Sequence, residues 1–422
     1  MKLFEDYVFL SDDINPNIDV KKDSLFGRGD WVEKLLEEGH KYNRKTINIK
    51  KQKLSQYNGV DKFILSYNCY WHQNWYKNIH KLNPMILNGL KNNTGKIIFI
   101  NHLEGQPLVS NDTNLNFLEP MYKTLKQLNI PPKNIIYISA NAKADFYHDK
   151  WCEENNIKNR MNIIGIFTDA ITAQKEAYKG RLNKHTFNQH LNILKNKTNV
   201  KYFIKVHRND RHFKTIITHD MWRKNLQDKL YTSHTEYARH GIGYPDTNSN
   251  IVKDWLNDLH KTKSDFEKTL PYTIEDTCEE QIINFDSDRD YTNKIYTLNL
   301  FNIYPSSWPL WKDTIFMRMG LFWHMWEYQP FILYSNVGSL KLLKQRGYET
   351  FSEIFDETYD EVEDNGLRLK MVCEEIEKIS RLSLDQAFNV YESVQDKLIH
   401  NRNQLEKNIE LDRFMEFFYE SI

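Results

Sequence analysis

The stretch QPFILYSNVGSLKLL, residues 329 to 343, decides the fold of this 422-residue chain. Its first part, PFILYS, is a short run of apolar and aromatic residues, which is typical of a buried strand. A turn with a single glycine, Gly338, follows this run. Leu340 and Leu343 then stand three residues apart, which is the spacing of neighbours on one face of a helix. The stretch therefore predicts a strand, a turn and a helix in immediate succession.

Short apolar runs of the same kind recur earlier in the chain. They are KFILS (62–66), KIIFIN (96–101), NIIYIS (134–139), MNIIGIF (161–167) and KYFIKV (201–206). Polar stretches with helical spacing separate them, for example the stretch that carries Met121, Leu125 and Leu128. Alternating strands and helices are typical of a parallel sheet covered by helices. The sequence therefore predicts the α/β class, with a second α/β series that begins at KYFIKV.

The length of the chain favours two large domains over one. Ser383 and Gln386 form a capping-box pattern that begins a helical C-terminal stretch. We expect the following segments: an N-terminal α/β domain (1–195), a C-terminal α/β domain (196–382) with an irregular excursion (241–295), and C-terminal helices that dock on the body (383–422).

The composition excludes several classes of protein. Lys plus Arg and Asp plus Glu are 57 each, so the net charge is zero and we expect no strong nucleic-acid binding. Glycine is scarce at 15 residues, which disfavours a glycine-rich phosphate loop. The four cysteines are far apart, and no apolar run approaches the ~18 residues of a membrane span. With no signal-peptide pattern at the N-terminus, we expect a cytoplasmic protein. Because the net charge is zero, any phosphate group would have to be recognised by a local group of residues.

The first candidate site is HRNDRHFK, residues 207 to 214, directly after the run KYFIKV. Arg208, Arg211 and Lys214 are spaced by three, so they would converge on one face as the segment becomes a helix. Strands of α/β domains carry ligands at their carboxyl ends, and guanidinium groups bind pyrophosphate in two-pronged geometry. These residues predict a nucleotide-diphosphate site, whereas the alternative is a solvated basic helix start.

The second candidate site is the turn after PFILYS. Free N–H groups near Asn336, Gly338 and Ser339 at a helix start would form an anion cradle. The alternative is an ordinary strand-to-helix turn, in which Gly338 supplies the conformation and Asn336 or Ser339 the cap.

Two further motifs carry acidic residues. In NHLEG, residues 101 to 105, Glu104 is a candidate general base that would face an interdomain cleft, and the alternative is a surface carboxylate. Asp286 and Asp288 form a D-x-D pattern such as metal-dependent GT-A glycosyltransferases use, although acidic loops produce it by chance. The histidines lack the spacing of a zinc site, and we predict no metal site.

Residues 95 to 382 resemble the fucosyltransferase-like glycosyltransferases of GT-B type, a family common in phage and large-virus genomes. The resemblance rests on KIIFINHLEG, the segment 136–163, HRNDRHFK and, most specifically, the block 329–369. In that block the pattern and order of the following residues are similar to the family: Gln329, Pro330, Phe331, Gly338, Leu340, Gly347, Phe351, Asp356, Glu357, Tyr359, Asp360 and Arg368.

The resemblance implies two Rossmann-like domains facing a cleft, with a nucleotide sugar held mainly by the C-terminal one. Transfer would be a direct displacement that needs no metal or other cofactor. Arg208 and Arg211 fall on the family's arginine-rich motif, and Lys214 takes a basic position there. Phe213 replaces a histidine often seen in that motif.

One departure from the family concerns the donor. Met319 and Gly320 stand where the family usually has a Glu-Lys pair, and Ser306 or Ser307 replaces an acidic residue. Losing one charged hydrogen bond costs roughly 1.5 to 3 kcal/mol, so donor binding would be weakened.

Two hypotheses follow from the resemblance and the departure. The leading one is a glycosyltransferase-like protein that moves a sugar from a nucleotide-diphosphate sugar to a hydroxyl acceptor, which would be a glycan, a protein or a hydroxylated nucleobase. The alternative is a catalytically silent structural or binding protein on the same fold, with virion or oligomer partners. A metal-dependent GT-A enzyme using Asp286 and Asp288 is a third reading.

Overall fold

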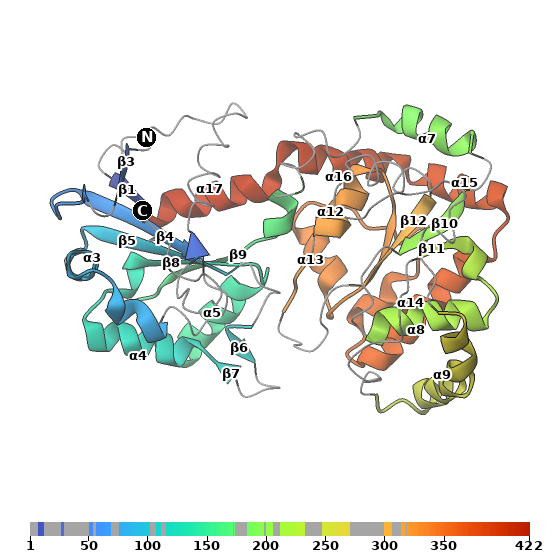
Figure 1. Cartoon of the computed structure of the whole chain (residues 1–422), viewed down its shortest axis with the longest axis horizontal. Coiled ribbons are helices and arrows are strands. Elements are labelled where there is room, and N and C mark those ends of the chain that lie inside the picture. The colour runs from blue at the N-terminus through green and yellow to red at the C-terminus, as the bar shows by residue number, and fades with distance from the viewer. Residues whose placement is uncertain are drawn as a thin grey trace. The chain divides into compact units, whose positions relative to one another are not determined.

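The computed structural model describes the following residues: 7–11, 27–28, 50–53, 56–68, 76–101, 107–110, 115–171, 173, 184–197, 200–205, 212–232, 247–270, 299–305, 314–317 and 319–422. The chain forms two compact units (Figure 1). Unit 1 takes the described residues of 1–168, 310–316 and 409–422, and unit 2 takes those of 169–309 and 317–408.

Unit 1 contains a mainly parallel sheet. Its parallel strands stand in the order β3-β1-β4-β5-β8-β9, and β2 pairs with β4 antiparallel. β5 and β8 are buried along almost their whole length, as inner strands with both faces covered are. The bounds are β1 (Tyr7–Ser11), β2 (Gly27–Arg28), β3 (Lys50–Lys53), β4 (Lys62–Asn68), β5 (Gly95–Asn101), β8 (Ile135–Ser139) and β9 (Asn162–Gly165), with a separate ribbon of β6 (Val109–Ser110) and β7 (Leu115–Asn116).

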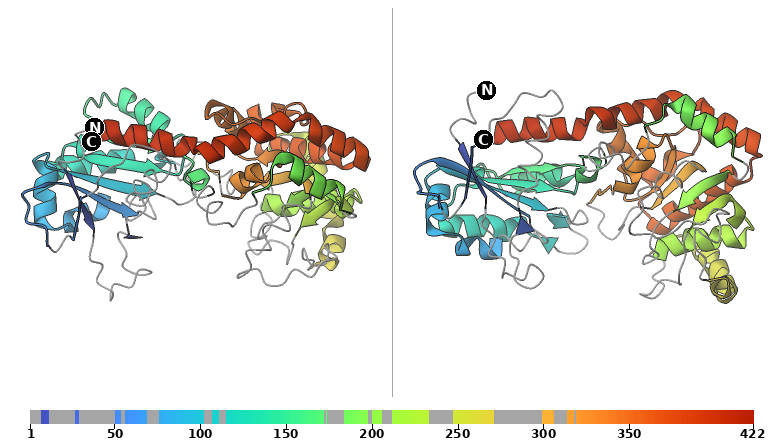
Figure 2. Two further views of the ribbon diagram at one scale, coloured as in Figure 1. Left: turned by 90° about the horizontal axis from the view of Figure 1, so that it is seen from above. Right: turned by 45° about the horizontal axis from the view of Figure 1, so that its top comes forward.

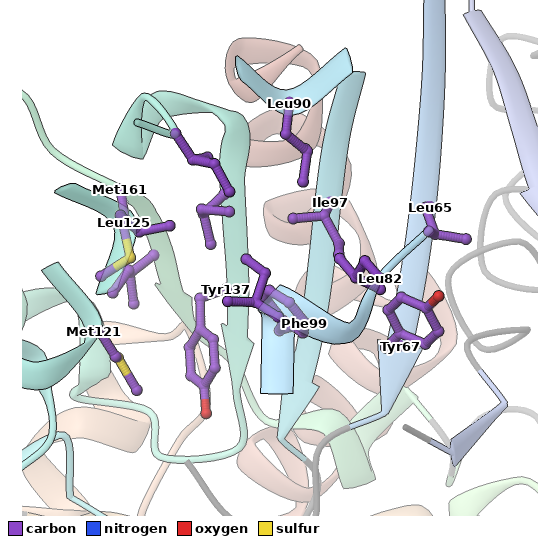
Figure 3. Packing of buried hydrophobic residues seen from close by; sticks show 14 of the residues in the cluster. Leu65, Tyr67, Leu82, Leu90, Ile97, Phe99, Met121, Leu125, Tyr137 and Met161 are labelled. Atoms are coloured by element: carbon purple, nitrogen blue, oxygen red, sulfur yellow. The ribbon is translucent and has the colours of Figure 1, made fainter. Parts of the chain in front are cut away.

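Helices cover the two faces of this sheet. One core cluster contains alternate residues of the strands together with the apolar sides of three helices, and Figure 3 shows Leu90, Ile97, Phe99, Leu125 and Tyr137 in it. These helices are α3 (Pro84–Lys91), α4 (Leu118–Leu128) and α5 (Ala144–Glu154); the short turn η2 (Ile79–Lys81) precedes α3, and η3 (Pro132–Asn134) lies between α4 and α5.

The C-terminal helix α17 (Ile409–Ser421) packs on unit 1 from another side. The ring of Phe418 lies 6.4 Å from that of Phe9, which alternates along β1 with Val8 and Leu10 of the core cluster. Because successive strand residues point to opposite faces, α17 covers the face opposite to α3, α4 and α5. Figure 2 shows this helix running along the sheet of unit 1.

Unit 2 contains a second parallel sheet in the order β11-β10-β12-β13. Its strands are β10 (Lys201–Lys205), β11 (Leu230–Thr232), β12 (Asn299–Pro305) and β13 (Phe331–Tyr334). The other elements are α7 (Phe187–Lys195), α8 (His212–Arg223), η4 (Gln227–Lys229), α9 (Asn250–Lys268), α12 (Met319–Trp326), α13 (Ser339–Gln345), η5 (Glu357–Glu361), α14 (Asn365–Ser380), α15 (Leu384–Ser393) and α16 (Gln395–Lys407).

The predicted α/β class and the helical C-terminal stretch are confirmed by these elements. The units do not divide where the expected domain boundaries lie. α7 belongs to unit 2 because Phe187 stacks on Tyr391, with ring centroids 5.7 Å apart. Of the C-terminal helices, α15 and α16 belong to unit 2 and α17 to unit 1.

The expectation of an irregular excursion over 241–295 is wrong for the part that the structure describes. α9 is a 19-residue helix, and its buried side is formed by Val252, Trp255, Leu256, Leu259 and Phe266. Charged residues between these positions obscure the apolar stripe in the sequence. Among the described residues, no helix is long and apolar enough to cross a membrane.

Candidate functional site

The strand order of unit 2 places a topological switch point between β10 and β12. From β10 the chain passes outward to β11, and from β12 it passes in the opposite direction to β13. β10 and β12 are hydrogen-bonded neighbours, with Ile204 opposite Asn302. In doubly wound sheets, ligands bind beyond the carboxyl ends of the strands at such a point.

In the sequence, the arginine-rich motif follows β10. β10 ends at Lys205, and Arg208 and Arg211 lie outside the described residues. Lys214 occupies the first turn of α8. Phe213, which replaces the family's histidine, is a core residue whose ring lies 5.4 Å from that of Tyr334 at the end of β13. The start of α8 and the turn after β13 therefore lie beside each other.

The turn after β13 is closed by an acidic side chain of the same chain, Asp360. Its carboxylate accepts hydrogen bonds from the backbone N–H groups of Leu340 (3.0 Å) and Lys341 (3.1 Å), and its carbonyl accepts one from Gly338 (2.8 Å). The N–H of Ser339 donates to the carbonyl of Asn336 at 3.2 Å. Burial raises the pKa of Asp360.

The expectation of free N–H groups in this turn is therefore wrong. The physical reason is that η5 returns to the start of α13 and supplies an internal anion, which local sequence around Gly338 does not reveal. Gly338 has φ of 75°, so it supplies the left-handed conformation that the turn needs. Asn336 and Ser339 are buried, and their donor-binding role stays a prediction.

The other residues of the specific block hold this turn in place. Arg368 is almost fully buried and donates through Nε to the carbonyl of Ser335 at 2.8 Å. Its terminal nitrogens donate to the carbonyl of Val362 and to Oδ1 of Asn365. The hydroxyl of Tyr359 accepts from the N–H of Leu333 at 3.3 Å. The block that carries the family resemblance is thus a structural framework around β13.

The departure from the family lies at the start of α12, where Met319 and Gly320 stand. The nearby His324 is buried and its Nδ1 lies 2.5 Å from Oε1 of Gln329. Gln329 in turn donates to Oδ1 of Asn299 at 3.1 Å. Burial lowers the pKa of His324 to about 3, so the ring is neutral near pH 7. His324 therefore does not replace the family's lysine as a cation.

In unit 1, the described residues show what contacts the carboxyl edge of the sheet at one strand, β8. The loop after β8 is bound to a segment from later in the chain. The N–H of Ala142 donates to the carbonyl of Ile315 at 2.9 Å, and the N–H of Ile315 donates to Oδ1 of Asn141 at 3.1 Å. The carboxyl end of β8 is therefore covered by the protein itself. Sequence analysis missed this contact, which joins residues about 170 positions apart.

Two candidate motifs fall outside the described residues. Glu104 follows β5, which ends at Asn101, and Asp286 and Asp288 lie in the range 271–298. Within the described part of the chain, no group of three or more His, Cys, Asp or Glu side chains is arranged to hold a metal ion. The predicted roles of Glu104, Arg208, Arg211 and Lys214 stay predictions.

Known proteins resemble this chain in fold only. No family model matches it, and a search of curated proteins finds no match. Three similar solved structures are an α,α-trehalose-phosphate synthase (UDP-forming) from Burkholderia vietnamiensis (12% identity, 86% of this chain and 72% of the other, TM-score 0.45), a glycosyltransferase from Rickettsia africae (13%, 98% and 98%, 0.43) and HepE of Anabaena in complex with UDP and glucose (11%, 96% and 99%, 0.36). With these TM-scores, the likenesses carry no argument about what this chain binds.

Proposed function

We propose that this protein is a glycosyltransferase-like protein that binds a nucleotide-diphosphate sugar at the carboxyl edge of the unit 2 sheet. The observation that supports the proposal most is the position of the switch point between β10 and β12. Arg208 is three residues beyond the end of β10, within about 11 Å of it along the chain. The resemblance to fucosyltransferase-like glycosyltransferases independently assigns this motif to the donor.

The diphosphate contacts in this proposal come from Arg208 and Arg211, with Lys214 as a third cation. The start of α13 is closed by Asp360, and His324 is neutral, so neither supplies positive charge. Guanidinium groups suit this role because two N–H groups match two phosphate oxygens. The donor-binding role of Asn336, Gly338 and Ser339 stays a prediction, because the carbonyls of Asn336 and Gly338 and the hydroxyl of Ser339 are bonded within the protein.

Transfer to the acceptor would be a direct displacement at the anomeric carbon of the sugar. Glu104 is the proposed base, which takes the proton from the acceptor hydroxyl as its oxygen attacks. The bond from the anomeric carbon to the phosphate oxygen breaks, and the nucleoside diphosphate leaves with the electron pair. The acceptor would be a glycan, a protein or a hydroxylated nucleobase, and no metal or other cofactor takes part.

Calorimetric titration with GDP-, UDP- and CMP-sugars tests the donor site. A diphosphate sugar should bind more tightly than a CMP-sugar, which has a single phosphate. Arg208→Ala should lower affinity at least tenfold, because a charge-assisted bidentate contact is lost. Arg381→Ala is the matched control, since that arginine pairs with Glu377 on α14. No binding at millimolar donor by folded protein, or unchanged affinity in Arg208→Ala, would overturn the proposal.

A second candidate function is a catalytically silent binding or structural protein, conceived as a virion or oligomer component. The observation that favours it is the start of α12, where Met319 and Gly320 stand and His324 is buried and neutral. Product analysis after incubation with donor and mixed acceptors separates the two. Donor binding with neither transfer nor hydrolysis in the wild-type protein and in Glu104→Gln alike would support the silent protein.

A further inference from the structure

The zero net charge of the chain conceals an uneven distribution. Between Lys62 and Lys143 the sequence has nine lysines, no arginine and three acidic residues, Glu104, Asp112 and Glu119. This stretch therefore carries a balance of +6, and the remainder of the chain carries −6. The stretch contributes β4, β5, β8, α3 and α4 to unit 1. The positive charge of this stretch thus belongs to unit 1, where α3 and α4 each have a net charge of +1 and α5, just beyond the stretch, has −3.

Five lysines of this stretch lie on the surface of unit 1. Lys81, Lys91, Lys123, Lys126 and Lys133 are exposed, and none has a carboxylate within ion-pair distance among the described residues. In unit 2, by contrast, lysines are paired along α9, α13 and α14, for example Lys261 with Asp258, Lys268 with Asp265, Lys344 with Glu357 and Lys378 with Glu375.

Four lysines of the stretch 62–143 gather at the amino edge of the unit 1 sheet. We call them the amino-edge cluster: Lys91, Lys96, Lys126 and Lys133. Figure 1 shows α3 and α4 ending on the side where β5 and β8 begin. Asn134 joins these ends, because its Nδ2 donates to the carbonyl of Leu90 (2.7 Å) and to Oδ1 of Asn93 (3.0 Å).

Two lysines of the cluster, Lys96 and Lys133, lie close together. Nζ of Lys96 donates to the carbonyl of Lys133 at 3.0 Å, and burial together with the charge of Lys133 lowers the pKa of Lys96. Lys91 and Lys126 stand in the last turns of α3 and α4, where a cation is favourable beside free carbonyls. That effect accounts for these two lysines, and the hydrogen bond to the carbonyl of Lys133 accounts for Lys96, which leaves the charge of Lys133 beside Lys96 without a partner among the described residues. An external anion would stabilise all four.

We propose that the amino-edge cluster binds the phosphate backbone of double-stranded nucleic acid. Lysines act as point charges, which suit backbone contacts that do not depend on base sequence. Exposed amides of Asn88, Asn92 and Asn129 supply neutral donors for phosphate oxygens around the cluster.

Other anionic partners fit this surface less well. No Phe, Tyr or Trp side chain is exposed among the described residues from 62 to 143, so bases of a single strand find no large stacking platform there. Binding to a lipid surface would require a set of apolar side chains that insert into the lipid. Near α3, the exposed apolar side chains of the described residues are two, Val60 and Met85, so little apolar surface is available for insertion. The binding surface lies at the opposite edge from the carboxyl ends of the strands, so the inference does not depend on the proposed transferase.

Binding of a fluorescent 20-base-pair DNA duplex to the full chain tests this inference. Four phosphate contacts give a slope of about −3.6 for log K against log salt, which lowers affinity roughly 100-fold between 50 and 200 mM salt. The variant Lys91→Gln, Lys96→Gln, Lys126→Gln, Lys133→Gln should lose at least tenfold in affinity at 50 mM salt and most of that slope.

The matched control removes the same charge from unit 2: Lys261→Gln, Lys268→Gln, Lys344→Gln, Lys378→Gln. This control should retain the affinity of the wild-type chain, and circular dichroism establishes that both variants are folded. If both variants lost affinity for the duplex equally, the total charge of the chain would explain the effect, and the proposal would be overturned. Binding to vesicles with 30% phosphatidylserine but not to the duplex, or binding to neither, would also overturn it.

Discussion

The two units have the same sheet order but treat charged side chains differently. Numbered along the chain, the parallel strands follow the order 2-1-3-4 in unit 2 and 2-1-3-4-5-6 in unit 1, the flavodoxin-like doubly wound pattern. Unit 2 has paired cations and buried polar groups. Lys224, for example, forms an ion pair with Asp220, and the buried Arg368 donates to backbone carbonyls. In unit 1, the lysines of α3 and α4 have no carboxylate within ion-pair distance among the residues that the structure describes. The same strand order therefore occurs with two different patterns of charge pairing.

Acidification should separate the units most strongly. Burial lowers the pKa of His190 and His324 to about 3 and that of His219 to about 4, all in unit 2. In unit 1, burial lowers the pKa of His148 to about 4. An unfolded histidine titrates near pH 6.5, so below that pH the unfolded chain takes up protons that the buried rings do not. The stabilisation is complete above pH 6.5 and is lost as the pH falls toward the folded values.

The size of this effect follows from linkage. Each buried histidine changes the free energy of unfolding by about 1.4 kcal/mol per pH unit in this window, or ~2 kcal/mol at pH 5. Unit 2 should lose about 6 kcal/mol and unit 1 about 2 kcal/mol from these described rings. Hydrogen exchange read by mass spectrometry at pH 7 and pH 5, corrected for intrinsic rates, measures each unit. Equal loss of protection in both units would contradict the prediction.

Replacing one buried arginine of unit 2 should have the next largest effect. Arg368→Ala leaves the carbonyls of Ser335 and Val362 without a buried donor and opens a hole beside Tyr334. We expect a loss of about 3 to 5 kcal/mol, measured by urea unfolding. The matched change in unit 1 is Arg160→Ala, which removes a half-exposed pair with Asp149 and should cost about 1 kcal/mol or less. If the two substitutions lowered the free energy of unfolding by amounts within 1 kcal/mol of each other, the expected contrast between the units would be contradicted.

Sequence reasoning recovered the strands because they are continuous apolar runs. KIIFIN, NIIYIS and PFILYS correspond to β5, β8 and β13, and each boundary agrees to within one residue. It failed for α9, where the buried stripe from Val252 to Phe266 is interrupted by charged residues on the solvent side. Sequence patterns therefore predict helices and strands best when nearly all residues of the element are apolar.

The candidate site was less accessible to sequence reasoning, because its contacts join distant residues. Phe213 packs on Tyr334 across 121 positions, and Asp360 accepts a hydrogen bond from Leu340, which stands 20 positions earlier. Neither residue has a local signal for its partner. Asp360 did belong to the pattern of the family resemblance, but a pattern of shared residues does not distinguish a ligand-binding side chain from one that holds the turn.

The smallest expected difference concerns two single lysines, and it tests the contrast in charge pairing most directly. In unit 2, Nζ of Lys224 lies 2.6 Å from Asp220 and 2.7 Å from Glu377. Lys224→Gln leaves the buried carboxylate of Asp220 with Arg223 and the indole N–H of Trp255 as its remaining donors. Charged hydrogen bonds contribute roughly 1.5 to 3 kcal/mol, so we expect a loss of that order in urea unfolding.

Lys133→Gln in unit 1 should act in the opposite direction, because it removes repulsion on the half-buried Lys96 and breaks no ion pair with a described residue. The carbonyl that accepts from Lys96 belongs to the backbone and is retained. The change should raise stability by at most about 0.5 kcal/mol, a typical limit for surface substitutions, and the rise should shrink as added salt screens the repulsion. A loss above 1 kcal/mol would mean that Lys133 has an anionic partner within the protein, and the amino-edge cluster would then have no need of an external one.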